Sequence, residues 1–135
     1  MKVEKQLHCC TKSTIVRSQT GIATRYMRFV ETSVFTKRLV RLVDDDTYRK
    51  LQLELAANPE KGRLIQGTGG LRKVRMAARG KGKSGGARVI YLYLEQWQVV
   101  YLVYVYDKGE AEDLTAAQKK ELRAIAEVIK QEYRR

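Results

Sequence analysis

The stretch from Leu71 to Tyr91, LRKVRMAARGKGKSGGARVIY, places a loop rich in glycine and lysine between two patterns typical of β-strands. Basic and apolar residues alternate over 71–77, so that Lys73 and Arg75 lie on one face of the first strand and apolar side chains lie on the other. The second strand, residues 87–94, is rich in Val, Ile and Tyr. The stretch therefore predicts a strand, a basic loop and a second strand.

The residues that follow predict a further strand and a terminal helix. Residues 99–106 resemble 87–94 in composition, and Glu95-Gln96-Trp97 forms the turn of a hairpin between them. Thr115 and Gln118 have the spacing of a capping box. Apolar residues at helical spacing come next, which indicates an amphipathic helix: Leu122, Ile125, Ala126 and Ile129.

Upstream, a short strand near residues 27–31 precedes two helices. Apolar residues fall at helical spacing over 35–43 behind a Thr32/Ser33 cap, and Asp44-Asp45-Asp46 begins a second helix that ends at Asn58-Pro59. Three adjacent acids also suit a metal, but at a helix N-terminus we interpret them as a cap. The order β-α-α-β-β-β-α predicts an α+β fold, in which a helix hairpin and a C-terminal helix cover an antiparallel sheet of about four strands.

Residues 1–26 are polar and show no periodicity, so we expect a disordered or non-native extension before a domain of residues 27–135. Met27, where the pattern begins, is then the natural first residue. The extension holds His8, Cys9 and Cys10, and no other His or Cys occurs in the chain, so one copy cannot complete a closed zinc site. We expect neither a metal nor a cofactor.

Charge indicates the kind of partner. The chain has 27 Lys and Arg against 15 Asp and Glu, a formal net charge of +12, which favours polyanions such as nucleic acid. Nine basic residues and no acid lie between Lys61 and Arg88. No apolar run is long enough for a membrane span or the centre of a signal peptide, so we expect a cytoplasmic protein.

The glycine-rich loop does not match a nucleotide-binding motif. Residues 80–85 fit the string G-x-G-x-x-G, but that motif needs a helix after the loop, and here a strand follows. A Walker nucleotide-binding loop is excluded for the same reason, and a protein kinase is excluded because the chain has no HRD or DFG sequence. The loop is either a plain strand connection or a backbone that approaches a phosphate chain closely, and the acid-free clustering favours nucleic acid.

Residues 27–135 contain no His or Cys, which excludes histidine-pair RNase chemistry, cysteine nucleophiles and zinc hydrolysis. Phosphodiester cleavage remains chemically feasible. An RNA 2′-OH attacks its own phosphate when one group takes its proton, another protonates the leaving oxygen, and cations stabilise the added charge.

Several segments together resemble the HigB branch of the RelE-like toxins of type II toxin-antitoxin systems. The resemblance runs from Met27 to about Lys130, and the segments that carry it are Met27-Arg-Phe-Val-Glu-Thr, Leu55-Ala-Ala-Asn-Pro, Gly67-Thr-Gly-Gly-Leu-Arg-Lys-Val-Arg, Gly85-Gly-Ala-Arg-Val-Ile-Tyr and Leu102-Val-Tyr-Val-Tyr-Asp-Lys. It implies the RelE-like toxin fold and a ribosome-dependent endoribonuclease that cleaves mRNA without a metal. It also implies a HigA-type antitoxin with a helix-turn-helix domain. From composition, we expect no contact with a membrane.

The resemblance also assigns site residues. Such toxins carry two basic residues on one strand, an Arg at the start of the next and a basic residue after the last strand. Lys73 and Arg75 match the first pair, Arg88 the second position and Lys108 the third. We assign Lys73 to proton transfer, Arg75 and Arg88 to the phosphate, and Lys108 to a supporting charge. We expect four further residues to bind RNA: Arg72, Arg79, Lys81 and Lys83.

Two features depart from the family pattern. Gly109 stands where relatives have an Arg, and the C-terminal segment offers no match to the family's catalytic Tyr. Tyr91, Tyr93 and Tyr106 are either its substitutes or ordinary sheet aromatics.

Two other functions fit the same sequence. In one, a non-catalytic RNA or ribosome-binding module uses its basic strands to hold phosphates. In the other, a structural protein docks a partner through its C-terminal helix, and its RNA binding would then depend little on salt.

Overall fold

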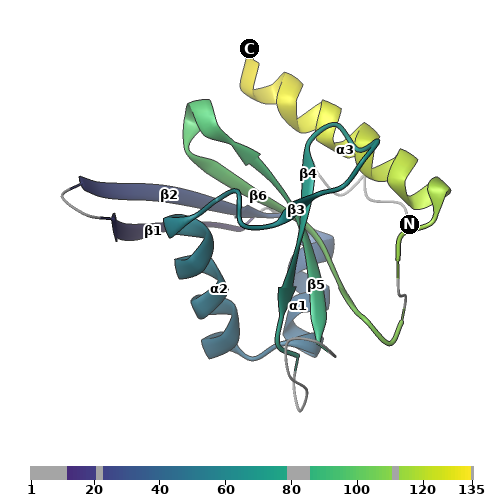
Figure 1. Cartoon of the computed structure of the whole chain (residues 1–135), viewed down its shortest axis with the longest axis horizontal. Helices are drawn as coiled ribbons and strands as arrows, with labels where there is room; N and C mark the ends of the chain where they lie inside the picture. Colours follow the sequence, from purple (N-terminus) through teal and green to yellow (C-terminus); the bar gives the residue numbers. More distant parts are fainter. Residues whose placement is uncertain (1–11, 21–22, 79–85, 111–112, 135) are drawn as a thin grey trace.

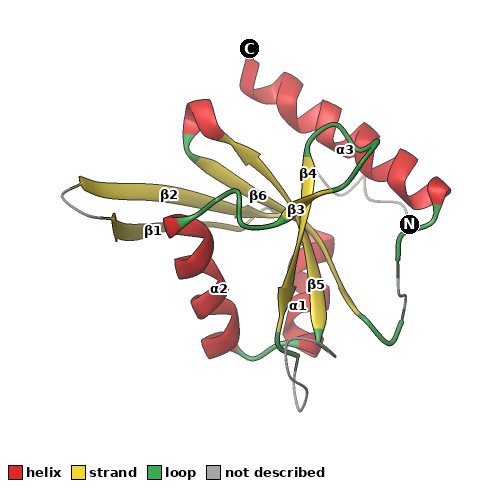
Figure 2. Cartoon of the chain, viewed as in Figure 1, coloured by secondary structure: helices red, strands yellow, loops and turns green. Residues whose placement is uncertain are grey.

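The computed structural model describes residues 12–20, 23–78, 86–110 and 113–134. Figure 2 shows where the helices and strands lie. In chain order the elements are β1 (Lys12–Thr20), β2 (Ala23–Glu31), α1 (Ser33–Leu42), α2 (Asp45–Ala57), β3 (Arg63–Leu64), β4 (Leu71–Met76), β5 (Ala87–Leu94), a short 3-10 turn at Glu95–Trp97, β6 (Val99–Asp107) and α3 (Ala116–Arg134). No helix among these residues is both long and apolar enough to cross a membrane.

The strands form one mixed sheet of six, in the order β1-β2-β6-β5-β4-β3. The α+β class is confirmed, but the expectation of about four antiparallel strands is wrong. β2 runs parallel to β6, through Arg28 opposite Val99 to Glu31 opposite Leu102, whereas the other neighbours are antiparallel. β3 has two residues, too few to produce an alternating pattern in the sequence.

Helices cover both faces of the sheet, with α1 and α2 on one side and α3 on the other (Figure 1). On the first face, Phe35 and Leu39 of α1 and Leu51 of α2 pack on inward side chains of the strands. On the second, Leu122, Ile125, Ala126 and Ile129 of α3 pack on Leu71, Ile90 and Leu92. Each helix presents an apolar stripe to the sheet, so the centre of the sheet is buried on both sides.

The predicted helix starts are confirmed. Thr32 caps α1, since its hydroxyl accepts from the Phe35 N–H at 3.1 Å. Asp44 caps α2 by accepting from the Thr47 N–H at 2.8 Å. The capping box of α3 is complete, because Thr115 and Gln118 each accept from the other's N–H, at 3.1 and 2.9 Å.

The N-terminal segment differs from the expectation. Residues 12–20 and 23–26 are not a disordered tail, because β1 pairs with β2 from Lys12 opposite Glu31 to Thr20 opposite Ala23. Val16 packs against the core from this added strand. Long-range pairing supplies the order that local periodicity does not indicate. His8, Cys9 and Cys10 lie outside the described residues, and Met27 as natural first residue stays a prediction.

Candidate functional site

A row of polar side chains crosses three neighbouring strands. Arg75 of β4 lies opposite Arg88 of β5, which lies opposite Tyr106 of β6. Directly opposite residues project to the same side of a sheet, and strands lie roughly 5 Å apart, so the row spans roughly 10 Å. Lys73 joins this face two residues before Arg75. The structure thus brings together three of the four predicted catalytic residues, and we call Lys73, Arg75, Arg88 and Tyr106 the basic cluster.

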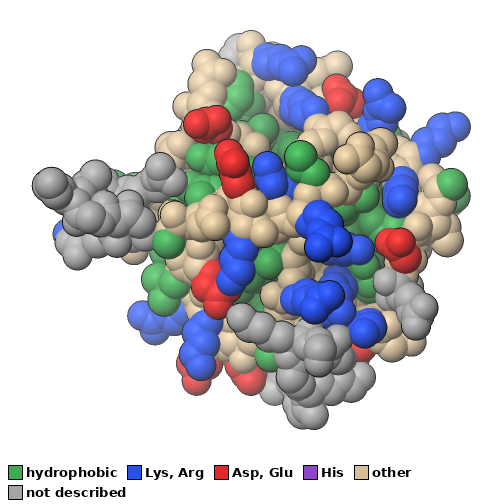
Figure 3. Space-filling view, in the orientation of Figure 1, with side chains coloured by type: hydrophobic (Ala, Val, Ile, Leu, Met, Phe, Trp, Pro, Cys, Tyr) green, Lys and Arg blue, Asp and Glu red, His purple; other side chains and the backbone are tan. Residues whose placement is uncertain are grey.

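The basic cluster lies on the face that α3 covers, since Tyr106 packs with Leu122 and Ile125. Exposure varies within it: Arg88 is 7% exposed, Arg75 is exposed and Lys73 is half-buried. Figure 3 shows Lys and Arg side chains coming close together near the centre and lower right of the visible face, with few Asp or Glu between them. Such a surface attracts a phosphate chain, and burial holds one cation of the cluster, Arg88, in a fixed position.

Tyr106 is buried beside these cations. Its hydroxyl has no hydrogen-bond partner among the described residues, although the side chain is 3% exposed. Burial raises the pKa of Tyr106, as does the nearby charge of Asp113, while Arg88 opposes the rise. The hydroxyl therefore stays protonated at neutral pH, available to donate a hydrogen bond.

Asp113 brings one acid to the edge of the cluster. Its Oδ1 accepts from the Leu114 N–H at 2.8 Å and lies 3.5 Å from the Lys73 Nζ. These two contacts, the backbone one first, lower the pKa of Asp113. The carboxylate is 73% exposed, so it neutralises Lys73 only from the solvent side.

Arg38 of α1 approaches the same end of the sheet. Its Nε donates to the Val105 carbonyl at 2.7 Å, and its guanidinium lies 4.8 Å from the centre of the Tyr104 ring. Tyr104 stacks on Tyr106 at 6.2 Å between centroids, and Arg38 also pairs with Glu110 at 2.6 Å. Arg38 thereby binds the edge of β6 that β2 leaves unpaired beyond Leu102.

Sequence reasoning missed Arg38 and Asp113. The only signals were positional: Arg38 is three residues from the buried Phe35, and Asp113 immediately precedes Leu114 and the cap of α3. Neither signal indicates a long-range contact, so pairing with Val105 or Lys73 was not predictable from it.

The remaining predicted residues have separate locations. Lys108 is exposed after β6, where its N–H donates to the Gly86 carbonyl at 3.0 Å, so its backbone lies beside the start of β5. Arg72 precedes Lys73 in β4, so its side chain projects to the opposite face of the sheet. It donates to the carbonyls of Glu60 and Gly62 at 3.1 and 2.8 Å. Its contact with RNA stays a prediction. The other three residues assigned to RNA lie outside the described residues: Arg79, Lys81 and Lys83.

Only one of the three candidate tyrosines lies at the cluster. The Tyr91 hydroxyl donates to the Pro59 carbonyl at 2.7 Å and accepts from the Gly62 N–H at 2.8 Å, on the other face of the sheet. Tyr93 accepts from Gln98 at 3.2 Å. Tyr91 and Tyr93 therefore have structural roles, and Tyr106 alone faces Arg88.

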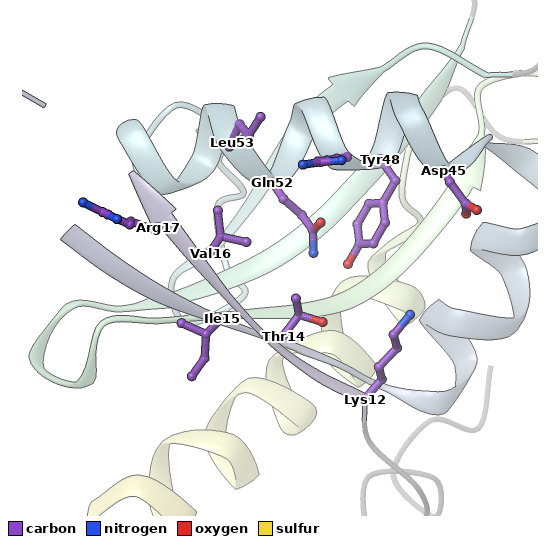
Figure 4. A pocket seen from close by; sticks show the side chains of 10 residues that line it. Lys12, Thr14, Ile15, Val16, Arg17, Asp45, Tyr48, Gln52 and Leu53 are labelled. Atoms are coloured by element: carbon purple, nitrogen blue, oxygen red, sulfur yellow. The ribbon is translucent and has the colours of Figure 1, made fainter. Parts of the chain in front are cut away.

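A hollow of about 480 Å³ lies away from the cluster, between β1 and α2. Figure 4 shows Thr14 and Val16 directed toward Tyr48 and Gln52 across it. Beneath it the Tyr48 hydroxyl donates to the buried Glu31 at 2.7 Å, and burial, together with Glu31, raises the pKa of Tyr48. This satisfied buried pair is a structural contact. The hollow depends on β1, whose order the sequence pattern does not predict.

Comparisons with known proteins address the same part of the chain. Residues 32–134 match a family model described as the RelE toxin of the RelE/RelB toxin-antitoxin system. The structure is similar to that of E. coli toxin RelE in the free state, solved as a double arginine-to-alanine mutant. The TM-score is 0.48 with 16% sequence identity, over 65% of this chain and 88% of that chain. The matched family range contains the whole basic cluster, whereas β1 and β2 precede it.

Proposed function

This chain belongs to the RelE toxin family, whose members generally cleave mRNA and pair with an antitoxin, and from that premise we propose a ribosome-dependent endoribonuclease. It cuts translated mRNA by metal-independent attack of the 2′-OH on the adjacent phosphate. The segments that resemble the HigB branch further support a HigA-type antitoxin as the partner that silences it.

The observation that carries the proposal is the row of Arg75, Arg88 and Tyr106 on adjacent strands, with Lys73 on the same face. A phosphate placed over this row contacts cations from two strands at once. Strand pairing holds the backbone of each in place, so little rearrangement is needed as charge builds up on phosphorus. A surface made for binding alone would not need a buried arginine beside a buried hydroxyl.

Each side chain then has a distinct role. Arg75 and Arg88 stabilise the phosphorane-like transition state, and Lys108 adds positive charge at the rim. Lys73 transfers a proton during attack or departure. Tyr106 donates a hydrogen bond to a phosphoryl oxygen or to the leaving 5′-oxygen, because its hydroxyl is protonated at neutral pH and makes no other hydrogen bond among the described residues.

The test is cleavage of a defined mRNA with and without programmed ribosomes, with new 5′ ends mapped by primer extension. Arg88→Ala is the diagnostic variant, and Arg41→Ala, exposed at the end of α1, is the matched control. Cuts that need the ribosome, persist in the control and vanish in Arg88→Ala are expected. RNA binding without any cut would replace this function with the non-catalytic module.

A further inference from the structure

Exposed aromatic side chains gather at the other end of the α3 face. Tyr26 is 60% exposed and Trp97 is 38% exposed, next to Ile15 at 62%. With Arg28 and Tyr133 they line a hollow of about 330 Å³. We call these five residues the aromatic platform; none of the basic cluster lines it.

Four separate elements build this platform. Ile15 of β1 lies opposite Arg28 of β2, so both project to one side of the hairpin. The 3-10 turn supplies Trp97, whose ring lies 5.6 Å from that of Tyr133 near the end of α3. The Arg28 N–H donates to the Gln98 carbonyl at 3.1 Å, which ties the hairpin to the turn. The Trp97 and Tyr133 rings therefore pack on each other, and the backbone two residues after Tyr26 is fixed to the turn.

Positive charge predominates around the platform, although Glu132 lies close enough to Tyr133 to help raise the pKa of that tyrosine. Arg28 is the only charged side chain in the lining, and the exposed Arg17, which also borders the hollow between β1 and α2, lies opposite Tyr26 in the strand pair. Aromatic rings with arginines beside them bind single-stranded nucleic acid, because every base has a face to stack and each phosphate attracts a cation. Protein partners also favour Tyr, Trp and Arg. The chain's net charge of +12 and the arginine-only lining favour the polyanion.

We propose that the aromatic platform binds unstacked bases of single-stranded RNA, with Arg17 and Arg28 on the flanking phosphates. The inference rests on the proposed function for its choice of RNA, and adds a second RNA contact remote from the reacting phosphate. α3 separates the two sites: its 19 residues span roughly 28 Å at 1.5 Å per residue. RNA bound at the platform is therefore not the nucleotide being cut.

Trp97 is the only tryptophan in the chain, so its fluorescence reports on the platform directly. The probe is a short single-stranded 2′-O-methyl oligonucleotide, which binds but lacks the 2′-OH needed for cleavage. We expect it to quench Trp97 emission, and the same sequence as a duplex to quench less because its bases are stacked. Tyr26→Ala should weaken the quenching affinity about tenfold. Leu64→Ala, an exposed apolar truncation on β3, is the matched control.

Arg88→Ala separates this inference from the proposed function, since quenching should survive when cleavage is lost. Binding seen by anisotropy without any change in Trp97 emission would overturn the platform, whether or not the wild-type chain cuts mRNA. Equal affinity of Tyr26→Ala and wild type would do the same. Emission that changes with the cognate antitoxin but not with RNA would assign the surface to a protein partner instead.

Discussion

The two ends of the α3 face carry side chains in opposite states of burial. At the end where α3 begins, Arg88 and Tyr106 are 7% and 3% exposed and lie on paired central strands. At the end where α3 finishes, Tyr26 and Trp97 are 60% and 38% exposed on a hairpin and a turn. One end holds charge in place beneath the surface, and the other displays rings to solvent.

This difference separates chemistry from binding. A transition state needs charges fixed by packing, because a loose side chain reorganises at the moment of reaction. Binding of variable RNA needs accessible rings and cations that tolerate many sequences. The two ends should therefore respond independently to substitution, since sites far apart with no shared partners behave additively.

The largest expected effect is that of Arg88→Ala on cleavage. Removing one fixed donor from a developing charge typically lowers a rate by roughly 100- to 1,000-fold, and we expect a loss in that range here. Single-turnover cleavage on programmed ribosomes measures it, with circular dichroism to verify folding. A folded variant that retains a tenth of the wild-type rate would remove Arg88 from the chemistry and break the comparison.

Tyr106→Phe comes next. The hydroxyl makes no hydrogen bond among the described residues, so its removal should leave the free energy of unfolding unchanged or raise it. Cleavage should fall by about tenfold or more if the hydroxyl donates to the reacting phosphate. Urea unfolding and single-turnover kinetics are measured on one preparation. Unchanged kinetics would mean that the orphaned hydroxyl has no part in the reaction.

Tyr91→Phe is the matched opposite of that variant. Here the hydroxyl bonds both Pro59 and Gly62, so its loss leaves buried partners unsatisfied and should cost about 1–3 kcal/mol of unfolding free energy. Cleavage by the folded fraction should be close to wild type, because Tyr91 projects to the other face. A variant as stable as wild type but slow in cleavage would reverse the roles given to the two tyrosines.

These tyrosines also show how much of the structure can be predicted from the sequence. Local periodicity was enough to predict β4, β5, β6 and the three helices, and the strand alternation put Lys73 and Arg75 on one face. It could not rank Tyr91, Tyr93 and Tyr106, because all three occur in similar apolar strands. The hydrogen-bond partners of Tyr91, for example, are Pro59 and Gly62, which are about thirty positions away in the sequence.

The same limit explains the missed hairpin and the missed edge contacts. β1 has an alternating exposure that is visible only once β2 is beside it, and parallel pairing of β2 with β6 joins residues 71 positions apart. Long-range pairing is a property of the whole chain, and a window of neighbouring residues does not contain it. The aromatic platform combines residues from four elements and was unpredictable for that reason.

The smallest expected effect is that of Asp113→Asn, which removes the acid beside Lys73. Affinity of the basic cluster for RNA should rise about twofold at low salt and converge with wild type as salt rises, because exposed ion pairs are weak and screened.

The effect of Asp113→Asn on the stability of the fold should depend on pH and disappear in acid. The folded-state pKa of Asp113 is lowered from its ordinary 3.8, so its ionised form stabilises the fold above that pH, and the contribution is lost as pH falls through the folded value. Wild type and Asp113→Asn should therefore differ slightly in stability near neutral pH and coincide in strong acid. The carboxylate is largely solvated, so the neutral-pH difference should be small. A large loss of stability in Asp113→Asn would contradict this. It would show that the hydrogen bond from the Leu114 N–H to Asp113, just before α3, stabilises the fold more than the ion pair with Lys73 does.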